Sequence, residues 1–394
     1  MKRYGNLYDK VISPDNLRLA DTIARKGKVD THGVRLHDRN REANIVALYE
    51  ALLTQTYHTS PYQTFTIYEP KERLISRLPY YPDRIVHHAI MNVVEPIWLS
   101  VYTHNTFSCI KGRGIEGCAR AVDRIIAKYK GHPLYCLKID IRKYYPSIDH
   151  DVLKRIVRKK IKDQKLLWLI DEIIDSSEGL PIGNHTSGFL ANLYLAYFMH
   201  YINERIKYEL GIDVDKVRLD AVEYADDIPF FSDSKAVLHK VLEIVTRYFA
   251  EELHLVIKPN YQIFPIAKNR KDKHGRALDY VGYKFYREQK LLRKGVKKNL
   301  CRAVAKLRKF NPTIGYKEFK IAISAWIGWV KHSNSKHILK LITNSLNKEY
   351  YGILRHEALE IRGSRQRQLC LSLEHSGSGS PCTAGRRTAH PVAV

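Results

Sequence analysis

Two adjacent acids stand between two apolar runs in the segment Val222-Glu-Tyr-Ala-Asp-Asp-Ile-Pro-Phe-Phe231. Short apolar runs on both sides of a polar turn predict two strands joined by a tight hairpin. Paired aspartates are common in plain turns, because aspartate tolerates turn geometry and hydrogen-bonds its own backbone. The tetrapeptide Tyr224-Ala-Asp-Asp227 therefore predicts a hairpin by itself, and a chemical role only if other groups gather around it.

A third acid follows a second apolar run, Leu134-Tyr-Cys-Leu-Lys-Ile-Asp140, which predicts a buried strand that ends in Asp140. The carboxylates of Asp140, Asp226 and Asp227 would repel one another unless cations neutralise them. Mg²⁺ suits carboxylate oxygens, and a pair of such ions can clamp the attacking and leaving oxygens of a phosphoryl transfer. We therefore predict these three acids as catalytic residues that hold two Mg²⁺ ions, with Mn²⁺ as a possible substitute. The nearby Asp149 is predicted to cap a helix instead.

The charge of the chain predicts a polyanionic partner. The 394 residues include 66 Lys and Arg against 41 acids, a net charge of +25. The excess is uneven, because residues 290–348 hold fifteen basic residues and one acid, Glu318. A basic surface of this kind in a chain with 44% apolar residues indicates a globular protein that binds nucleic acid.

The cysteines and the first residues bear on the compartment. Six cysteines are scattered without a Cys-x-x-Cys pair, which argues against a zinc site and a disulfide framework and favours a reducing cytoplasm. No apolar run approaches the length of a membrane span, and no apolar segment follows the first residues. We expect a cytoplasmic protein without a membrane partner.

Composition and pattern divide the chain into four parts. Residues 1–130 are predicted as a mixed N-terminal part, and residues 131–290 as a part that alternates strands with helices and carries the acids. Residues 291–360 are predicted as basic and helical. Residues 361–394, rich in Gly and Ser, are predicted as a disordered tail.

A series of motifs carries a resemblance to a known family. In chain order they are Arg73-Leu-Ile-Ser76, Asp83-Arg-Ile-Val-His-His-Ala89, Lys111-Gly-Arg-Gly114, Ile139-Asp-Ile-Arg-Lys-Tyr-Tyr-Pro-Ser-Ile148, Leu180-Pro-Ile-Gly-Asn-His-Thr-Ser187, Tyr224-Ala-Asp-Asp227 and Leu278-Asp-Tyr-Val-Gly-Tyr283. Their order resembles that of reverse transcriptases over residues 5–345, and the ordered series is far more specific than any one member. The resemblance implies an α/β (α+β) right-hand polymerase of a bacterium or a phage. Its parts would be an N-terminal extension and fingers at residues 1–130, an antiparallel palm with helices and the remaining fingers elements at 131–290, and a basic helical thumb at 291–360. It also implies an RNA-directed DNA polymerase that takes dNTPs, a template RNA and the RNA/cDNA duplex.

Within that family the chain looks most like the reverse transcriptases of diversity-generating retroelements. Most relatives have Pro-Gln-Gly where this chain has Pro181-Ile182-Gly183, and the segment ahead of the fingers is compact.

 In full, this segment reads Tyr68-Glu-Pro-Lys-Glu-Arg-Leu-Ile-Ser76. The subfamily usually continues Ile-Gly-x-x-x-Ser-Gln, whereas this chain has Gly188 at the last position. The subfamily implies mutagenic copying at template adenines and a small, basic, oligomeric accessory protein as a partner.

The resemblance also assigns roles to single residues. The metal ligands that it implies are Asp140, Ile141, Asp226 and Asp227. The nucleotide-binding residues that it implies are Lys71, Arg73, Arg113, Tyr145, Ile182 and Lys258. The residues that it implies for primer and template are Tyr224, Gly282, Tyr283, Lys297, Lys298 and Arg302.

Several of these residues also have a plain structural interpretation. Tyr145 would exclude a 2′-hydroxyl if it walls the sugar pocket, but a tyrosine at such a position is often core, as we expect for Tyr144. Lys71 and Arg73 could belong to a solvated hairpin, Arg113 to a glycine turn, and Lys258 to an exposed strand end.

Ile182 leads to a hypothesis about fidelity. An amide at this position can hydrogen-bond in the nucleotide pocket, whereas isoleucine offers only shape. A site that hydrogen-bonds its substrate discriminates far more strongly than an apolar one. We therefore expect low fidelity, with a buried isoleucine in a strand-to-helix turn as the alternative.

Three other functions remain open at this point. A retron-type or phage-defence reverse transcriptase would use the same chemistry. A group II intron maturase is disfavoured by Pro-Ile-Gly and by the lack of a long DNA-binding extension. A basic RNA-binding module with structural acids would lack polymerase activity altogether.

Overall fold

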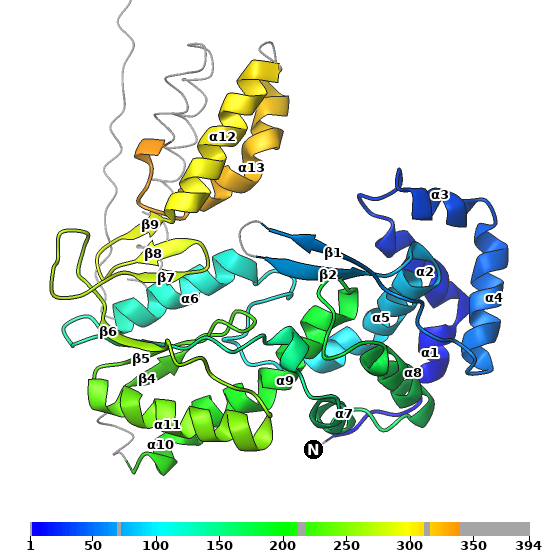
Figure 1. The fold of residues 1–394 in the computed structure, drawn as a ribbon, viewed down its shortest axis with the longest axis horizontal. Coiled ribbons are helices and arrows are strands. Elements are labelled where there is room, and N and C mark those ends of the chain that lie inside the picture. Colours follow the sequence, from blue (N-terminus) through cyan, green and yellow to red (C-terminus); the bar gives the residue numbers. More distant parts are fainter. Residues whose placement is uncertain (1, 69–71, 212–217, 311–315, 339–394) are drawn as a thin grey trace, which may run out of the picture. The chain divides into compact units, whose positions relative to one another are not determined.

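The computed structural model describes residues 2–68, 72–211, 218–310 and 316–338 (Figure 1). The chain divides into two compact units, Met1–Lys290 and Leu291–Val394. The predicted tail 361–394, the last part of the predicted thumb and Lys71 lie outside the described residues. Whether the predicted fingers, palm and thumb act as such remains a prediction.

The first unit begins with helices that pack around one long helix. Their bounds are α1 (Tyr8–Ile12), α2 (Pro14–Ala24), α3 (His32–Asp38), α4 (Arg41–Leu53) and, after a short irregular turn at Tyr80–Arg84, α5 (Ile85–Leu99). α2 begins where the Ser13 side chain accepts a hydrogen bond from the Asn16 amide, with Pro14 at the first helical position. α2 packs against α5 and α4. Their apolar faces join the core of the unit.

A separate hairpin connects α4 to α5. β1 (Gln63–Ile67) pairs antiparallel with β2 (Arg73–Arg77), and the register joins Gln63 to Arg77 and Ile67 to Arg73. The hairpin is mostly exposed on both faces, and Phe65 and Leu74 lie among its exposed apolar side chains. Packing therefore stabilises it less than the strands of the central sheet.

The centre of the first unit is a four-stranded antiparallel sheet. Its strands are β3 (Tyr135–Lys138), β4 (Leu219–Ala221), β5 (Pro229–Ser232) and β6 (Gln262–Pro265), in the spatial order β4-β5-β3-β6. β5 is buried along its whole length, which explains its continuous apolar sequence. α11 (Lys235–Glu252) packs against β3, β5 and β6. The mixed helix and antiparallel-sheet fold expected from the sequence is confirmed.

Further helices surround this sheet. They are α6 (Gly114–Lys128), α7 (His150–Arg158), α8 (Gln164–Asp175), α9 (His185–Glu204) and α10 (Ile206–Glu209), with a short 3₁₀ turn at Tyr145–Ser147. The Asp149 carboxylate accepts a hydrogen bond of 2.9 Å from the Val152 amide at the start of α7, so its predicted role as a helix cap is confirmed. Tyr144 is buried, as expected, and its hydroxyl donates to the carbonyl of Ala191 on α9.

A second small sheet ends the first unit. β7 (Leu278–Tyr280) pairs antiparallel with β8 (Tyr283–Phe285) through the two-residue turn Val281–Gly282. β9 (Lys290–Leu292) follows at the boundary of the two units.

The described part of the second unit is a pair of helices. α12 (Lys294–Phe310) and α13 (Tyr316–Lys331) contact each other. Leu300 and Val304 of α12 are buried, as are Phe319, Ile323 and Ile327 of α13. No helix among residues 2–68, 72–211, 218–310 and 316–338 is long and apolar enough to span a bilayer.

Candidate active site

Strand register brings the three predicted acids to one edge of the central sheet. β3 and β5 run antiparallel, and Lys138 lies opposite Pro229 at the end of their ladder. Asp140 follows this pair by two residues, and Asp227 precedes it by two residues. Neighbouring antiparallel strands keep such positions opposite each other. Asp140 and the Asp226–Asp227 pair therefore lie at the same edge of the sheet, although 86 positions separate Asp140 from Asp226 in the sequence.

The hairpin at Tyr224–Asp227 is closed by its own backbone. The Tyr224 amide donates to the Asp227 carbonyl at 3.1 Å, and the Asp227 amide donates to the Tyr224 carbonyl at 3.2 Å. Ala225 has a φ of 55°, which a residue with a side chain adopts only at some cost. The tight turn places Asp226 at its tip and Asp227 at the start of the returning strand.

Two lysines contact the carboxylates of this site. Lys258 Nζ lies 2.7 Å from Asp140 Oδ2, and Lys138 Nζ lies 3.4 Å from Asp227 Oδ2. Lys258 was predicted as a nucleotide-binding residue; in this structure its ammonium contacts Asp140, and its contact with a nucleotide stays a prediction. Lys138 was missed by the sequence analysis, because a lysine inside an apolar strand gives no signal of the group that it faces.

Burial raises the pKa of Asp227, and the neighbouring charges of Asp226 and Asp140 raise it further. Lys138 opposes this shift and lowers the pKa of Asp227. The second carboxylate oxygen, Asp227 Oδ1, is buried and has no hydrogen-bond partner in the described part of the chain. A buried carboxylate oxygen of this kind requires a cation or a donor.

The chemistry of these donors fits Mg²⁺, since all three side chains offer carboxylate oxygens. In the described part of the chain, however, no three His, Cys, Asp or Glu side chains lie close enough together to hold a metal ion. The described carboxylates are thus not arranged as the two-metal site that the sequence predicts. Instead, Lys258 contacts Asp140 and Lys138 contacts Asp227. Ile141, the fourth predicted ligand, has a buried side chain, and its backbone forms a bridge with Ile257.

Tyr145 lies beside the acids. It is half-buried, and its ring makes an edge contact with Tyr144 at a centroid distance of 5.7 Å. Burial raises its pKa, and the charges of Cys109 and Asp226 contribute to the shift. The structure therefore brings Tyr145 near the Tyr224–Asp227 hairpin, and its role as a wall of the sugar pocket stays a prediction.

The comparisons with known proteins agree on one family. The model of the family "Reverse transcriptase (RNA-dependent DNA polymerase)" matches residues 69–282, more than half of the chain. The chain belongs to the reverse transcriptase family.

Curated relatives match smaller parts of this reverse transcriptase. Protein YkfC of Escherichia coli is 27% identical over 165 residues, which cover 38% of this chain and 43% of YkfC. The group II intron-encoded protein LtrA of Lactococcus lactis is 24% identical over 209 residues, which cover 49% of this chain and 34% of LtrA. The chain thus spans less than half the length of these two relatives.

Among solved structures, the telomerase of Candida albicans in complex with a fragment of telomeric RNA matches with a TM-score of 0.46 and 11% identity. The match covers 78% of this chain and 59% of the telomerase chain.

The Pro-Ile-Gly turn of this reverse transcriptase is bound to the β1–β2 hairpin. The Ser76 amide donates to the Ile182 carbonyl at 2.9 Å. Gly183 has a φ of 131°, and a Cβ there would lie 2.5 Å from the Ser76 carbonyl oxygen, so only glycine fits. The Ile182 side chain is half-buried, and its contact with a nucleotide stays a prediction.

The unusual Gly188 has a structural partner. A Cβ at Gly188 would lie 2.5 Å from the Sγ of Cys109, a residue with a φ of 54°. A glutamine, as the retroelement subfamily usually has, would displace the Cys109 side chain. Cys109 thus occupies the space that a longer side chain at residue 188 would need.

The predicted fingers residues differ in their surroundings. Arg73 lies exposed on β2. Arg113, by contrast, donates two hydrogen bonds to the loop before α6, to the carbonyls of Thr103 at 2.7 Å and Thr106 at 2.9 Å. In this structure its guanidinium braces that loop, and nucleotide contact remains a prediction.

The braced loop leads to a second group that the sequence analysis missed. Glu223, directly before the Tyr224–Asp227 hairpin, is fully buried and accepts a hydrogen bond of 2.8 Å from the Thr106 hydroxyl. Its Oε1 has no hydrogen-bond partner among the residues that the structure describes, and burial raises its pKa to about 8. The only sign of this buried acid in the sequence is that Glu223 stands between the apolar residues Val222 and Tyr224.

The predicted primer-binding hairpin is strained at its tip. Gly282 has a φ of 81°, and Val281 has a φ of 38°, which is rare for a β-branched residue. Tyr283 was predicted to contact primer or template, but its side chain is buried against Phe285. If the Tyr280–Tyr283 hairpin contacts a primer, we therefore expect its backbone to make the contact. Tyr224 is half-buried next to the acids.

The predicted thumb residues lie on α12 of the second unit. Lys298 and Arg302 are exposed, and Lys297 is partly exposed. α12 contains no acidic residue. One face of this helix therefore presents only positive charge.

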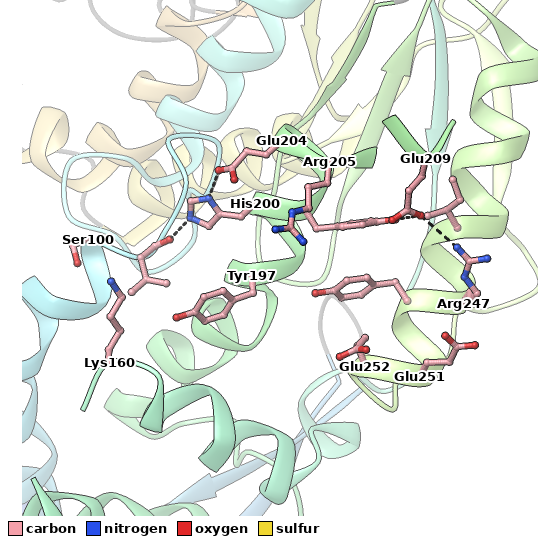
Figure 2. Close-up of a pocket in the computed structure, with 14 residues that line it drawn as sticks. Ser100, Lys160, Tyr197, His200, Glu204, Arg205, Glu209, Arg247, Glu251 and Glu252 are labelled. Carbon is pink, nitrogen blue, oxygen red and sulfur yellow. Dashed lines mark hydrogen bonds and ion pairs between the residues drawn. The ribbon is translucent and has the colours of Figure 1, made fainter. Parts of the chain in front are cut away.

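A polar cavity of about 720 Å³ lies between α9 and α11 (Figure 2). Many of its charged groups satisfy one another: His200 pairs with Glu204 at 2.6 Å, and Glu209 binds both Tyr201 and Arg247. None of the predicted site residues lines it.

Proposed function

We propose that this reverse transcriptase is an RNA-directed DNA polymerase that copies a template RNA into cDNA with two Mg²⁺ ions. The observation that carries the proposal is the meeting of Asp140 with Asp226 and Asp227 at one sheet edge, with a buried carboxylate oxygen of Asp227 that lacks a partner. Bound Mg²⁺ would neutralise the triphosphate and activate the primer hydroxyl. The carboxylates would hold the ions, and Tyr145 would wall the sugar.

The proposed nucleic-acid partners are supported by unmatched positive charge. A cavity of about 980 Å³ next to the β1–β2 hairpin is lined by Lys28, Arg77 and Arg84, together with Phe65 and Tyr81. None of the three cations pairs with a carboxylate within the described residues. Burial lowers the pKa of Lys28 and of Arg84, and the positive charge of Arg77 lowers both further. Cations beside aromatic rings suit the phosphates and bases of a single strand.

We also propose the finer assignment to the diversity-generating retroelements, with error-prone copying of template adenines for mutagenic retrohoming and with a small basic accessory protein. Its support is Ile182 in place of the usual glutamine and the compact fingers segment. We place the protein in the cytoplasm, for which the free thiols of Cys109, Cys118, Cys136 and Cys301 are the support.

A second candidate is a group II intron-encoded reverse transcriptase. The match to LtrA favours it. Accurate copying of adenines would support this candidate over the retroelement assignment.

The polymerase proposal is tested with the full chain, a primed RNA template, dNTPs and Mg²⁺. Wild type should extend the primer, and Asp226→Asn should lower the rate by at least about a thousandfold, because it removes a charge that the transition state needs. Template binding should persist. Asp30→Asn serves as the control, since this carboxylate is almost fully exposed and far from the site in sequence. Normal extension by Asp226→Asn would overturn the proposal and leave a non-catalytic RNA-binding protein.

The fidelity proposal is tested by sequencing cDNA made from one defined template. Ile182→Gln restores an amide that can hydrogen-bond a correctly seated base pair. An effect of about 1–2 kcal/mol would lower misincorporation opposite adenine roughly five- to thirtyfold. Equal error frequencies in the two proteins, with synthesis intact, would contradict the loosened pocket but not the polymerase.

A further inference from the structure

Two contacts join the catalytic hairpin to the Val281–Gly282 hairpin. Lys138 Nζ donates to the carbonyl of Asp279 on β7 at 2.9 Å and lies 3.4 Å from Asp227 Oδ2. The Tyr280 hydroxyl donates to the main-chain carbonyl of Asp227 at 3.0 Å. Asp227 is therefore held at its side chain by Lys138 of β3, which also binds β7, and at its backbone by Tyr280 of β7.

Both contacts lie in protected surroundings. Tyr280 is fully buried, and the Lys138 side chain is largely buried. Hydrogen bonds that are shielded from water, above all those of a charged group, are stronger than exposed ones. The two contacts therefore restrict how far Asp227 can move relative to β7.

The turn that follows β7 is under strain. Val281 is β-branched and has a φ of 38°, a conformation that persists only where the surrounding structure holds it. Tyr280, the residue directly before it, is anchored on Asp227. The turn tip thus has a set position relative to the carboxylates.

We propose that Lys138 and Tyr280 are positioning residues that couple the Val281–Gly282 turn to Asp227 and so align the 3′ end of a primer with the carboxylates. This inference rests on the proposed polymerase function. Lys138 does so through the Asp279 carbonyl and the Asp227 carboxylate, and Tyr280 through the Asp227 carbonyl. Neither residue needs to touch the incoming nucleotide.

The test uses the full chain and single-nucleotide extension of a primed RNA template. Lys138→Met should lower kcat roughly ten- to fiftyfold, because a charge-assisted contact is lost, and Tyr280→Phe roughly three- to tenfold. The KM for dNTP should stay within about twofold of wild type, because neither residue binds the nucleotide.

Lys138→Arg should restore part of kcat, since it can still donate to the Asp279 carbonyl. Lys284→Met, an exposed lysine on β8, is the matched control and should behave as wild type.

A second measurement reads the primer end without catalysis. A primer with 2-aminopurine at its 3′ end, bound without Mg²⁺, should give a different fluorescence in Lys138→Met and Tyr280→Phe at unchanged duplex affinity. If Lys138→Met does not fold, Tyr280→Phe tests the proposal by itself, because this substitution removes only one hydroxyl group. Folded variants with the kcat and fluorescence of wild type would overturn the coupling. Failure of wild type to extend any primer would instead overturn the polymerase, while the fluorescence still tests the coupling.

Discussion

The first unit contains two hairpins of the same length, Tyr224–Asp227 and Tyr280–Tyr283, that reverse the chain with different backbone conformations. In the first, only Ala225 has a positive φ, so Asp226 keeps an ordinary conformation and carries a charge at the tip. In the second, Val281 and Gly282 both have positive φ, as a type I′ turn requires. The comparison indicates that the first turn is built to present a side chain and the second to present backbone.

The bases of the two hairpins differ as well. Glu223 lies buried at the base of the first with one oxygen unpartnered, whereas the buried Tyr280 at the base of the second donates its hydroxyl to Asp227. Burial raises the pKa of Glu223 to about 8 and the pKa of Tyr280 well above its ordinary value, so only Glu223 titrates near neutral pH. Three predictions test the differences between the two hairpins, beginning with the largest expected effect.

Glu223 should make stability depend on pH. Its pKa in the folded chain, about 8, lies above its ordinary value of 4.5, so the folded state binds more protons between these values. The free energy of unfolding should therefore fall as the pH rises from about 5 to 8, by at most about 4–5 kcal/mol. Glu223→Gln should remove this dependence, measured by urea unfolding at pH 5 and pH 8. Glu243→Gln, an exposed residue of α11, should leave it unchanged. Equal pH dependence in wild type and Glu223→Gln would mean that Glu223 is not protonated in the fold.

Gly282→Ala should destabilise the second hairpin. A Cβ at a φ of 81° costs about 1–2 kcal/mol, and thermal unfolding should report it. Gly295→Ala is a control with the opposite expected sign, because Gly295 lies in α12 with open space around it and alanine favours helices. A stable Gly282→Ala protein would show that the turn relaxes to another type.

Val281→Asn should stabilise the same hairpin by about 0.5–1 kcal/mol, since asparagine tolerates the left-handed region that valine resists. Ala225→Gly, the corresponding change in the first turn, should have a smaller effect, because alanine is less strained there than a β-branched residue. Urea midpoints of both variants measure the difference. If Ala225→Gly gives the larger gain, the first turn is the more strained of the two.

Local patterns allowed much of this fold to be predicted. The apolar run before Asp140 is a buried strand, the acids lie at a hairpin, and Asp149 caps α7, because each of these features depends on residues a few positions apart. Lys138 and Glu223 could not be predicted, because their partners, Asp279 and Thr106, lie more than 100 residues away in the sequence.

The sequence by itself determined the family, the two acidic motifs and the positive charge of the chain, since residue type and spacing carry these properties. The tertiary structure alone decided which oxygen of Asp227 faces a lysine and which has no partner, and it placed Arg113 on a loop and Tyr283 in the core. The physical reason is that side-chain contacts and burial depend on strand register and packing between distant segments, whereas turns and strands follow from their immediate neighbours.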